Sequence, residues 1–239
     1  MRARAALGLT ALALALAGCT STVQGTASPS GAPSATGGSA PDGGSGSGSG
    51  STVTCEWRAD GSGRTVDADE PPSSVPAAGT VELHMSTGQG ELVLTLDRSG
   101  APCAAQALVS LAQQGFFDGS PCHRETDSAG LEVLQCGDPT GTGTGGPPWS
   151  YPTDVDGSET YPRGTVAMAN AGQGFDGSQF FLVWGDSQLA PDYTVVGTVD
   201  QAGLGVLDQI AANGNDGSNG PGDGAPNDPV TITSMTVRQ

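Results

Sequence analysis

From about residue 80 onward, the chain is divided into short runs in which apolar and polar residues alternate, and glycine-rich turns separate these runs. Alternation with a period of two is typical of strands that bury one face, and two such runs around a short turn predict a hairpin. The first pair, 81–85 and 92–96, flanks a turn at 87–90. Further strand-like runs occupy residues 131–136, 164–168, 179–183, 194–199 and 230–237. A chain divided in this way is predicted to be mostly β.

Two stretches have helical spacing instead. Apolar residues recur at helical intervals between positions 104 and 111, after Pro102, which is tolerated in the first turn of a helix, and Gly115 is placed to end it. A shorter helical pattern covers residues 204–211. Many short strands with only two helices favour a closed antiparallel β barrel capped by the two helices.

The charge of the chain is strongly acidic, with 25 acidic residues against 8 basic ones and a formal net charge of -17. This balance argues against nucleic acid and against an anionic membrane surface as electrostatic partners. Every basic residue is an arginine, and the absence of lysine excludes Schiff-base chemistry and the phosphate loops that need a lysine. Phosphoryl transfer is therefore a poor candidate.

The N-terminus has the features of an export signal. Arg2 and Arg4 give a positive start, an apolar stretch at 7–17 follows, and small residues precede Cys19. The apolar stretch is shorter than the ~20 residues that a helix needs to cross a bilayer. The sequence Leu-Ala-Gly-Cys at 16–19 resembles the lipobox of bacterial lipoproteins, in which the cysteine receives a diacylglycerol and becomes the mature N-terminus. We therefore expect residues 1–18 to be a lipoprotein signal peptide and Cys19 to anchor the protein to the outer face of the cell membrane; an ordinary signal with an incidental cysteine is the alternative.

The composition then changes twice before the periodic region. Residues 19–51 are rich in Gly, Ser and Pro and contain too little apolar surface to offset backbone ordering, which predicts a flexible linker. Residues 52–78 mix Cys55 and Trp57 with three prolines and are interpreted as an N-terminal extension. The folded domain is expected at 79–239.

Four cysteines follow the expected lipidation site, an even number in a protein expected to be exported, which favours two disulfide bonds. Cys122 and Cys136 flank a turn near 127–130, so antiparallel strands would bring them together and leave Cys55 to pair with Cys103. This pairing needs a local irregularity such as a bulge, because strict strand alternation puts Arg124 on the same face as Cys122 but does not put Gln135 on the same face as Cys136. Free buried thiols and other pairings remain open.

Three blocks of sequence then point to one known family. The first joins Cys-His-Arg at 122–124 to Leu-Gln-Cys-Gly-Asp-Pro-Thr-Gly-Thr-Gly-Thr-Gly-Gly at 134–146. The second is Gly-Thr-Val-Ala-Met-Ala-Asn-Ala-Gly at 164–172, continued by Gly-Ser-Gln-Phe-Phe at 177–181, and the third runs from Leu189 to Gly197. Together they resemble the cyclophilin family over residues 80–237, and three ordered blocks are far more specific than one glycine-rich loop.

This resemblance implies a peptidyl-prolyl cis/trans isomerase acting on exported or envelope proteins, with proline-containing polypeptides as partners. Its catalysis is non-covalent and needs no metal and no cofactor, and we expect a monomer that contacts the membrane only through its lipid anchor. The alternative within the same fold is a proline-peptide binding or chaperone module of the cell envelope with little turnover. A purely structural envelope protein is a third candidate, which the retained site residues argue against.

The resemblance also assigns roles residue by residue. Arg124 matches the catalytic arginine, whose permanent charge lies beside the imide nitrogen, and Gln135 and Phe181 complete the catalytic set. The positions matched to substrate binding are Val133, Gly143, Ala169, Asn170, Ala171, Gln179, Leu189 and Tyr193. Of these, residues 169–171 match a strand edge that hydrogen-bonds the residue before the proline.

The clearest departure from the family is Glu132, which falls where relatives have an aromatic residue at the floor of the proline pocket. A carboxylate in an apolar pocket is costly unless it is paired or neutralised. Either Glu132 turns outward and Leu131 fills the space, or Glu132 approaches Arg124 and competes for its guanidinium. We expect a partly open pocket with reduced activity, which Glu132→Phe should raise.

Other titratable residues receive plainer interpretations. His84 and His123 are far apart and lack the spacing of a zinc site, and His123 is predicted to be a structural hydrogen-bonding residue. The acidic turns at 154–159 and 213–228 lack the pattern of a calcium loop and are predicted to be solvated surface.

Overall fold

The structure is a computed structural model that describes residues 50–172 and 174–238. The expected signal peptide, Cys19 and the linker up to residue 49 lie outside the described residues. Within that range the chain forms β1 (Thr52–Thr54), β2 (Arg58–Ala59), β3 (Ser74–Pro76), β4 (Thr80–Thr87), β5 (Glu91–Asp97), α1 (Pro102–Gln113), β6 (Arg124–Ser128), β7 (Leu131–Cys136), β8 (Trp149–Pro152), β9 (Thr165–Asn170), β10 (Phe175–Val183), β11 (Val195–Val199), α2 (Gln201–Asn213), β12 (Asp223–Gly224) and β13 (Ile232–Arg238).

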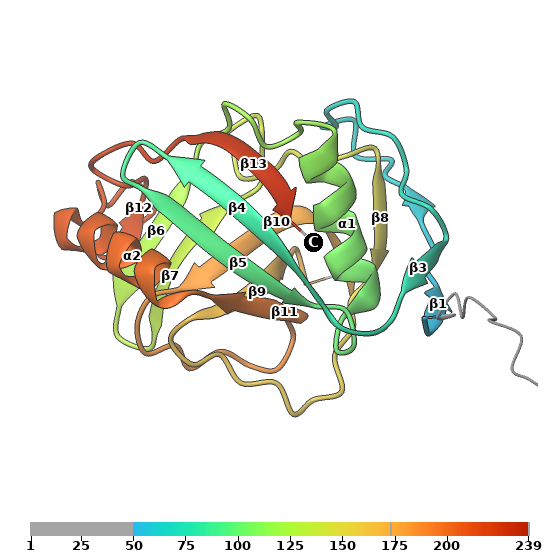
Figure 1. Cartoon of the computed structure of the whole chain (residues 1–239). Helices are drawn as coiled ribbons and strands as arrows, with labels where there is room; N and C mark the ends of the chain where they lie inside the picture. Colours follow the sequence, from blue (N-terminus) through green and yellow to red (C-terminus); the bar gives the residue numbers. More distant parts are fainter. Residues whose placement is uncertain (1–49, 173, 239) are drawn as a thin grey trace, which may run out of the picture. The chain divides into compact units, whose positions relative to one another are not determined.

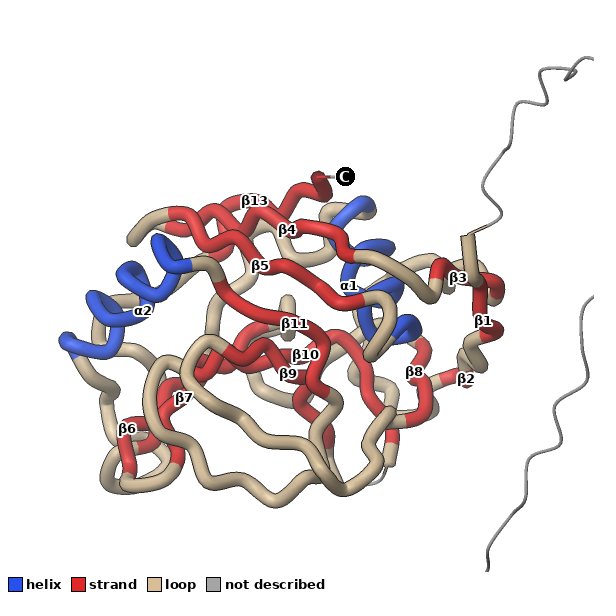
Figure 2. Tube along the Cα trace, turned by 60° about the horizontal axis from the view of Figure 1, so that its bottom comes forward, coloured by secondary structure: helices blue, strands red, loops and turns tan. Residues whose placement is uncertain are grey.

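Eleven of these strands form one antiparallel sheet that curls round on itself (Figure 1, Figure 2). Nine follow one another in the order β12-β6-β7-β10-β9-β11-β5-β4-β13, while β8 pairs with β10 and β2 with β8. The segment just before β6 contacts the start of β13, where Gly119 N–H donates to the Ile232 carbonyl at 2.7 Å and Cys122 N–H donates to the Val230 carbonyl at 2.8 Å. The predicted mostly β antiparallel fold with two helices is confirmed, and the sheet is a curled half-barrel in which these few hydrogen bonds take the place of a continuous closing strand pair.

The alternation seen in the sequence becomes alternate burial in the hairpin of β4 and β5. Leu83 on β4 pairs with Leu94 on β5, and both are fully buried. Inside the sheet they join the main core, to which Leu134, Met168 and Phe180 also belong. Helices α1 and α2 lie at opposite ends of the curled sheet (Figure 1). Apolar burial of this kind contributes about 25 cal/mol per Å² to folding.

Both helices lie where the spacing predicts them, and their ends have identifiable causes. Pro102 occupies the first turn of α1, and Gly115, with a φ of 68°, follows the last turn in the left-handed conformation that glycine adopts without strain. Helix α2 begins at Gln201, earlier than residue 204, because the Asp200 carboxylate caps it by accepting a hydrogen bond from Gly203 N–H at 2.9 Å.

The segment at 52–78 is attached to the sheet at several points. Strand β1 pairs with β3, and β2 pairs with β8. A Cys55–Cys103 disulfide joins this segment to the first turn of α1, and the Trp57 ring packs edge-on against the rings of Trp149 and Tyr151, each with a centroid separation of 5.3 Å. One face of the extension is therefore fixed against the sheet.

The second predicted disulfide, Cys122–Cys136, is also present. The ladder between β6 and β7 runs without a register shift and pairs Arg124 with Gln135, so the expected bulge is absent from it. Strand β6 begins only at Arg124, and the preceding Pro121 forms a bridge with Thr231 instead. Strict alternation therefore does not extend back to Cys122, which is why its side chain reaches Cys136.

Candidate active site

Arg124 is the first residue of β6, and its guanidinium has three hydrogen bonds to two partners. Nε and one terminal nitrogen donate to the two carboxylate oxygens of Asp223 at 2.8 and 2.6 Å, and the other terminal nitrogen donates to Gln135 Oε1 at 3.3 Å. The arginine side chain is one-third exposed. Hydrogen bonding to Asp223 is the main reason that the pKa of Arg124 lies above its ordinary value, and it also lowers the pKa of Asp223. The guanidinium is thus fixed in direction while one side remains accessible.

A chain of amides continues from the arginine across the sheet. Gln135 on β7 pairs with Phe181 on β10, and its Nε2 donates to Gln179 Oε1 at 2.9 Å. Gln179 in turn donates to the Gly145 carbonyl at 3.0 Å. Each side chain fixes the orientation of the next, so the sheet register places the two predicted glutamines in one polar track with Arg124.

An apolar cluster, here called the pocket cluster, lies apart from the main core. Its buried members are Val133, Tyr161, Ala167, Phe181 and Val183, and Leu131, Ala169, Leu189, Tyr193 and Val195 pack against them. The predicted wall residues Val133, Phe181, Leu189 and Tyr193 are therefore brought together. Of the two adjacent phenylalanines, Phe180 belongs to the main core and Phe181 to the pocket cluster, because neighbouring strand residues face opposite ways.

Tyr161 belongs to this cluster and was not identified from the sequence. Its ring lies 6.0 Å from the Tyr193 ring and 6.2 Å from the Phe181 ring, between centroids. Its hydroxyl donates to the Tyr193 carbonyl and accepts from the Tyr193 N–H, both at 3.0 Å. Tyr161 therefore fixes the loop that carries Tyr193. It follows an acidic turn without periodicity, so no sequence pattern marks it.

The loop at 138–146 is organised by the fully buried Asp138. One of its oxygens accepts hydrogen bonds from the backbone N–H groups of Thr142, Thr144 and Gly145 at 3.0–3.1 Å. Burial raises the pKa of this carboxyl, but hydrogen bonds from Thr140 and from the loop backbone outweigh it, so the net pKa is lowered. Gly143, with a φ of 77°, is held on this loop in a left-handed conformation.

His123 lies beneath the same loop and corrects one prediction. A Cβ on Gly143 would lie 3.4 Å from its ring, and both ring nitrogens are buried without a hydrogen-bond partner among the described residues. Burial is the main reason that the pKa of His123 is lowered. The expected hydrogen-bonding role is therefore wrong, because neither the loop nor the sheet offers this ring a polar partner.

Residues 169–171 lie at the end of β9, where the pairing with β10 shifts register between Asp176 and Phe180. Asn170 Nδ2 donates to the Asp192 carbonyl at 3.0 Å, and its Oδ1 accepts from Gly172 N–H at 2.9 Å. The Asn170 side chain therefore ties this strand end to the loop before β11. Ala171 is exposed beside it.

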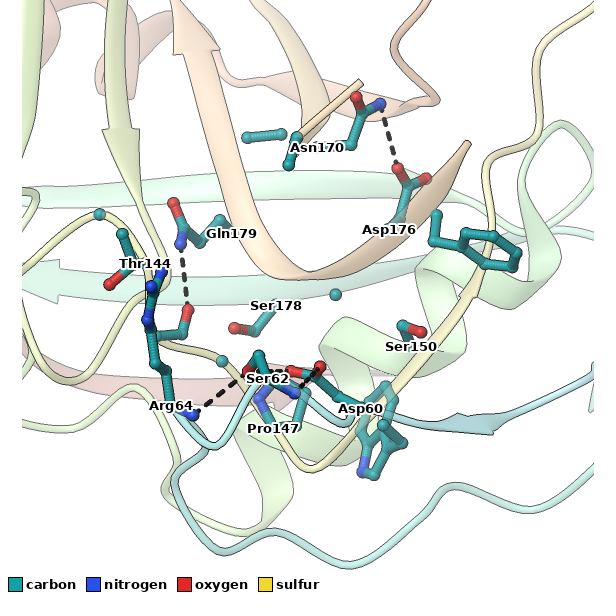
Figure 3. A pocket seen from close by; sticks show the side chains of 18 of the residues that line it. Asp60, Ser62, Arg64, Thr144, Pro147, Ser150, Asn170, Asp176, Ser178 and Gln179 are labelled. Carbon is teal, nitrogen blue, oxygen red and sulfur yellow. Dashed lines mark hydrogen bonds between the residues drawn. The ribbon is translucent and has the colours of Figure 1, made fainter. Parts of the chain in front are cut away.

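A groove of about 490 Å³ adjoins these elements. The sheet contributes residues 169–171 and 175–179, the glycine-rich loop contributes 143–147, and the extension contributes Asp60, Ser62 and Arg64 (Figure 3). Predicted site residues among its lining are Gln135, Gly143, Ala169, Asn170, Ala171 and Gln179. The groove and the pocket cluster share Ala169, so they are adjacent regions of one surface.

Glu132 takes the first of the two orientations that the sequence left open. Its carboxylate accepts a hydrogen bond from Asp186 N–H at 2.5 Å, and its backbone carbonyl accepts one from Trp184 N–H at 3.0 Å. Leu131 packs against the pocket cluster. The carboxylate therefore holds the turn at 184–187 and does not compete for Arg124.

Asp223 corrects the interpretation of the acidic turn at 213–228 as solvated surface. Residues 223–224 form β12, which pairs with β6, and Asp223 reaches Arg124 from there. Asn219 also donates to Asp223, at 3.1 Å. The sequence around Asp223 is glycine-rich and aperiodic. No pattern in it therefore marks Asp223 as the partner of Arg124, the predicted catalytic residue.

The arrangement can bind a peptide in the groove, accept a small apolar ring at the pocket cluster and present a fixed positive charge beside Gln135 at the groove. Within the described residues, no group of three or more His, Cys, Asp or Glu side chains lies close enough to hold a metal ion.

Comparison with known proteins identifies relatives with this architecture. Residues 80–237 match the family described as "Cyclophilin type peptidyl-prolyl cis-trans isomerase/CLD". The chain is 50% identical over 169 residues to the "Probable peptidyl-prolyl cis-trans isomerase B" of Mycobacterium tuberculosis, covering 66% of this chain and 54% of that protein. It is 40% identical over 136 residues to the "Peptidyl-prolyl cis-trans isomerase" of Helicobacter pylori, covering 56% and 82%. The chain thus spans about half the length of the Mycobacterium tuberculosis relative.

A solved structure has the same fold. The cyclophilin type isomerase of Cryptosporidium parvum aligns with a TM-score of 0.58 at 24% identity, covering 67% of this chain and 99% of that one. At this level of identity the likeness concerns the fold alone. The family match spans the curled sheet apart from β2, together with the polar track and the pocket cluster. The chain therefore belongs to the cyclophilin type peptidyl-prolyl cis-trans isomerase family.

Proposed function

We propose that this protein catalyses cis/trans isomerisation of the peptide bond before proline in exported polypeptides. The observation that carries the proposal is the position of Arg124, whose accessible guanidinium is oriented by Gln135 on the strand next to Phe181. The relatives named above as peptidyl-prolyl cis-trans isomerases support the same activity. The reaction has a clear physical need for a catalyst, since the bond has a barrier of ~18–20 kcal/mol and rotates in tens to hundreds of seconds unaided.

In this mechanism the proline ring enters the pocket cluster against Phe181, with Val133, Leu189 and Tyr193 as walls. Twisting the amide removes its resonance, and lone-pair density develops on the nitrogen. The permanent charge of Arg124 stabilises that density more than it stabilises the planar ground state, which is the condition for catalysis. Because Asp223 and Gln135 hold the guanidinium beforehand, little reorganisation is needed during the reaction.

The remaining predicted residues hold the flanking peptide backbone. The strand end at 169–171 would hydrogen-bond the residue before the proline in the manner of an added strand. Gln179 and Gly143 line the same groove. Fixing the backbone on one side while the proline ring is gripped on the other confines rotation to the bond between them. The mechanism needs no cofactor, and we propose that the protein acts as a monomer.

A peptide assay tests the proposal directly. Purified protein should accelerate isomerisation of an Ala-Pro peptide, and Arg124→Ala should remove about 100-fold or more of the catalysed rate, as expected for loss of a preorganised charge. Arg238→Gln, on β13, removes an equal charge elsewhere and is the matched control. A wild-type rate equal to the spontaneous rate would exclude the enzyme function.

We further propose an extracytoplasmic location with a lipid on Cys19. The two disulfides support an oxidising compartment. Neither described helix is long and apolar enough to cross a membrane. Acyl chains on Cys19 would attach the protein to the membrane, so Cys19→Ala should move the protein from the membrane fraction to the soluble fraction. Unchanged fractionation of this variant would contradict the lipid anchor.

One observation favours a second candidate, a proline-peptide binding module with slow turnover. The Asp223 carboxylate neutralises much of the Arg124 charge through two short hydrogen bonds. A neutralised arginine binds a peptide carbonyl but stabilises a developing negative charge less well. Affinity for proline peptides together with a near-spontaneous isomerisation rate would favour this candidate.

A further inference from the structure

The groove next to the proposed proline site has a wall that comes from outside the family-matched region. The match covers residues 80–237, whereas Asp60, Ser62 and Arg64 belong to the preceding extension. This wall is attached to the glycine-rich loop, because Val66 N–H donates to the Gly146 carbonyl at 2.8 Å and Asp60 N–H to the Pro148 carbonyl at 2.9 Å. The extension is therefore placed to contact any peptide in the groove.

Arg64 differs from the other charged residues that line this groove. The carboxylate of Asp60 accepts two hydrogen bonds from Ser62, both at 2.8 Å. The carboxylate of Asp176 is fully buried and accepts hydrogen bonds from Thr153 and Thr194. Among the described residues, none accepts a hydrogen bond from the Arg64 guanidinium or pairs with it, and Figure 3 shows its side chain extending along the wall that Thr144 and Gln179 also line.

The positions of the arginines also distinguish Arg64 from the other basic residues near the groove. The chain has no lysine, and only six arginines follow Arg2 and Arg4. Three of the six lie in or beside the groove: Arg64 lines it, Arg124 hydrogen-bonds to the lining residue Gln135, and Arg58 lies above the ring of the lining residue Phe175, 4.9 Å from its centroid. Arg124 is bonded to Asp223, and Arg58 lies 3.5 Å from Glu56. Of these three guanidinium groups, only that of Arg64 has no ion-pair or hydrogen-bond partner among the described residues.

We propose that Arg64 is a specificity-determining residue that selects peptides with an acidic side chain two or three positions before the proline. The position follows from the groove, since it extends from residues 169–171, the proposed site for the residue before proline, toward the extension. The substrate class of the proposed isomerase would then be acidic proline-containing segments. This inference rests on the proposed function.

The test uses the full chain and peptides of the forms Ala-Xaa-Ala-Pro and Xaa-Ala-Ala-Pro, with Glu, Gln or Lys at Xaa. The wild-type specificity constant for the Glu peptide should exceed that for the Gln peptide by about 3- to 5-fold in at least one form, as expected for a partly exposed ion pair. The ratio should fall toward one at high salt. It should also fall to about one in Arg64→Gln, persist in part in Arg64→Lys, and stay unchanged in the matched control Arg238→Gln.

The outcomes separate this inference from the proposed function. Equal rates for Glu and Gln peptides in the wild type, with both well above the spontaneous rate, would overturn the role of Arg64 and leave the isomerase standing. A preference that survives Arg64→Gln would overturn it as well. If no peptide is isomerised, titration calorimetry of the same Glu and Gln peptides decides, because the predicted affinity ratio does not depend on turnover.

Discussion

Arg124 and Glu125 are consecutive residues of β6 that face opposite sides of the sheet. Arg124 faces outward, and Asp223 and Gln135 hold its guanidinium. Glu125 faces inward and has no exposed surface, and neither of its carboxylate oxygens has a hydrogen-bond partner among the described residues. Burial, with a smaller effect from Asp127, raises the pKa of Glu125 to about 7.

The difference shows that one strand separates two electrostatic environments. On the outer face, an ionised group is stabilised by partners and kept in one orientation for a substrate. On the inner face, an ionised group would lack such partners, so the neutral form is favoured. Charge on the outer face should therefore affect activity, whereas charge on the inner face should affect stability.

The largest effect is expected from Glu125→Gln. The pKa of Glu125 is higher in the folded state than the usual 4.5, so the stability it contributes is present at low pH and is lost as pH rises through about 7. Removing the ionisable group should flatten this decline and raise the free energy of unfolding at pH 8 by up to about 3 kcal/mol. Urea unfolding between pH 5 and pH 8 measures it, with the exposed Glu70→Gln as the control. Equal pH slopes in the wild type and in Glu125→Gln would contradict the comparison.

Arg124→Lys tests the outer face. Lysine keeps the positive charge, but a single ammonium group cannot hold both Asp223 oxygens and Gln135 in the geometry of a guanidinium. We expect the specificity constant for an Ala-Pro peptide to fall roughly 10- to 100-fold while the melting temperature changes little. Wild-type activity in this variant would mean that charge alone is sufficient and that the polar track has no positioning role.

Asp223→Ala separates the positioning of Arg124 from its neutralisation. Without Asp223 the guanidinium loses two of its three hydrogen bonds, so we expect kcat to fall about 10-fold with little change in KM. Asp223→Glu should restore part of the loss, and Asp228→Asn, in the same acidic turn, is the control. A higher kcat in Asp223→Ala would show instead that the ion pair restrains catalysis, as in the binding-module candidate.

The smallest effect on the reaction is expected at Glu132. The structure removes the reason for expecting Glu132→Phe to raise activity, because the carboxylate holds the turn at 184–187 and lies away from Arg124. We now expect the specificity constant to change by less than about 2-fold, with a modest loss of stability from the lost hydrogen bond to Asp186 N–H. An increase of 10-fold or more would place the new ring in the pocket and contradict the observed orientation.

The sequence was most informative where the proposed function depends on residues within regular strands. Arg124, Gln135 and Phe181 could be identified because they occupy family-like blocks, and the strand pairing brings them together. Tyr161 and Asp223 could not be identified, because each lies in an irregular, acidic or glycine-rich segment. Such segments have no periodicity, and their neighbours in space are set by the strands on either side of them.

The sequence by itself determined the mostly β fold, the two helices and the family, because alternating burial and ordered motifs are local properties that can be counted along a chain. Both disulfide pairings could also be predicted from the sequence, although other pairings stayed open. Only the tertiary structure decided that Glu132 turns away from Arg124, that Asp223 holds this arginine, and that the extension places Arg64 on the groove wall. The physical reason is that hydrogen bonds to groups nearby in space orient these charged side chains, and Asp223 and Asp186, which hold Arg124 and Glu132, lie 99 and 54 residues away in the sequence.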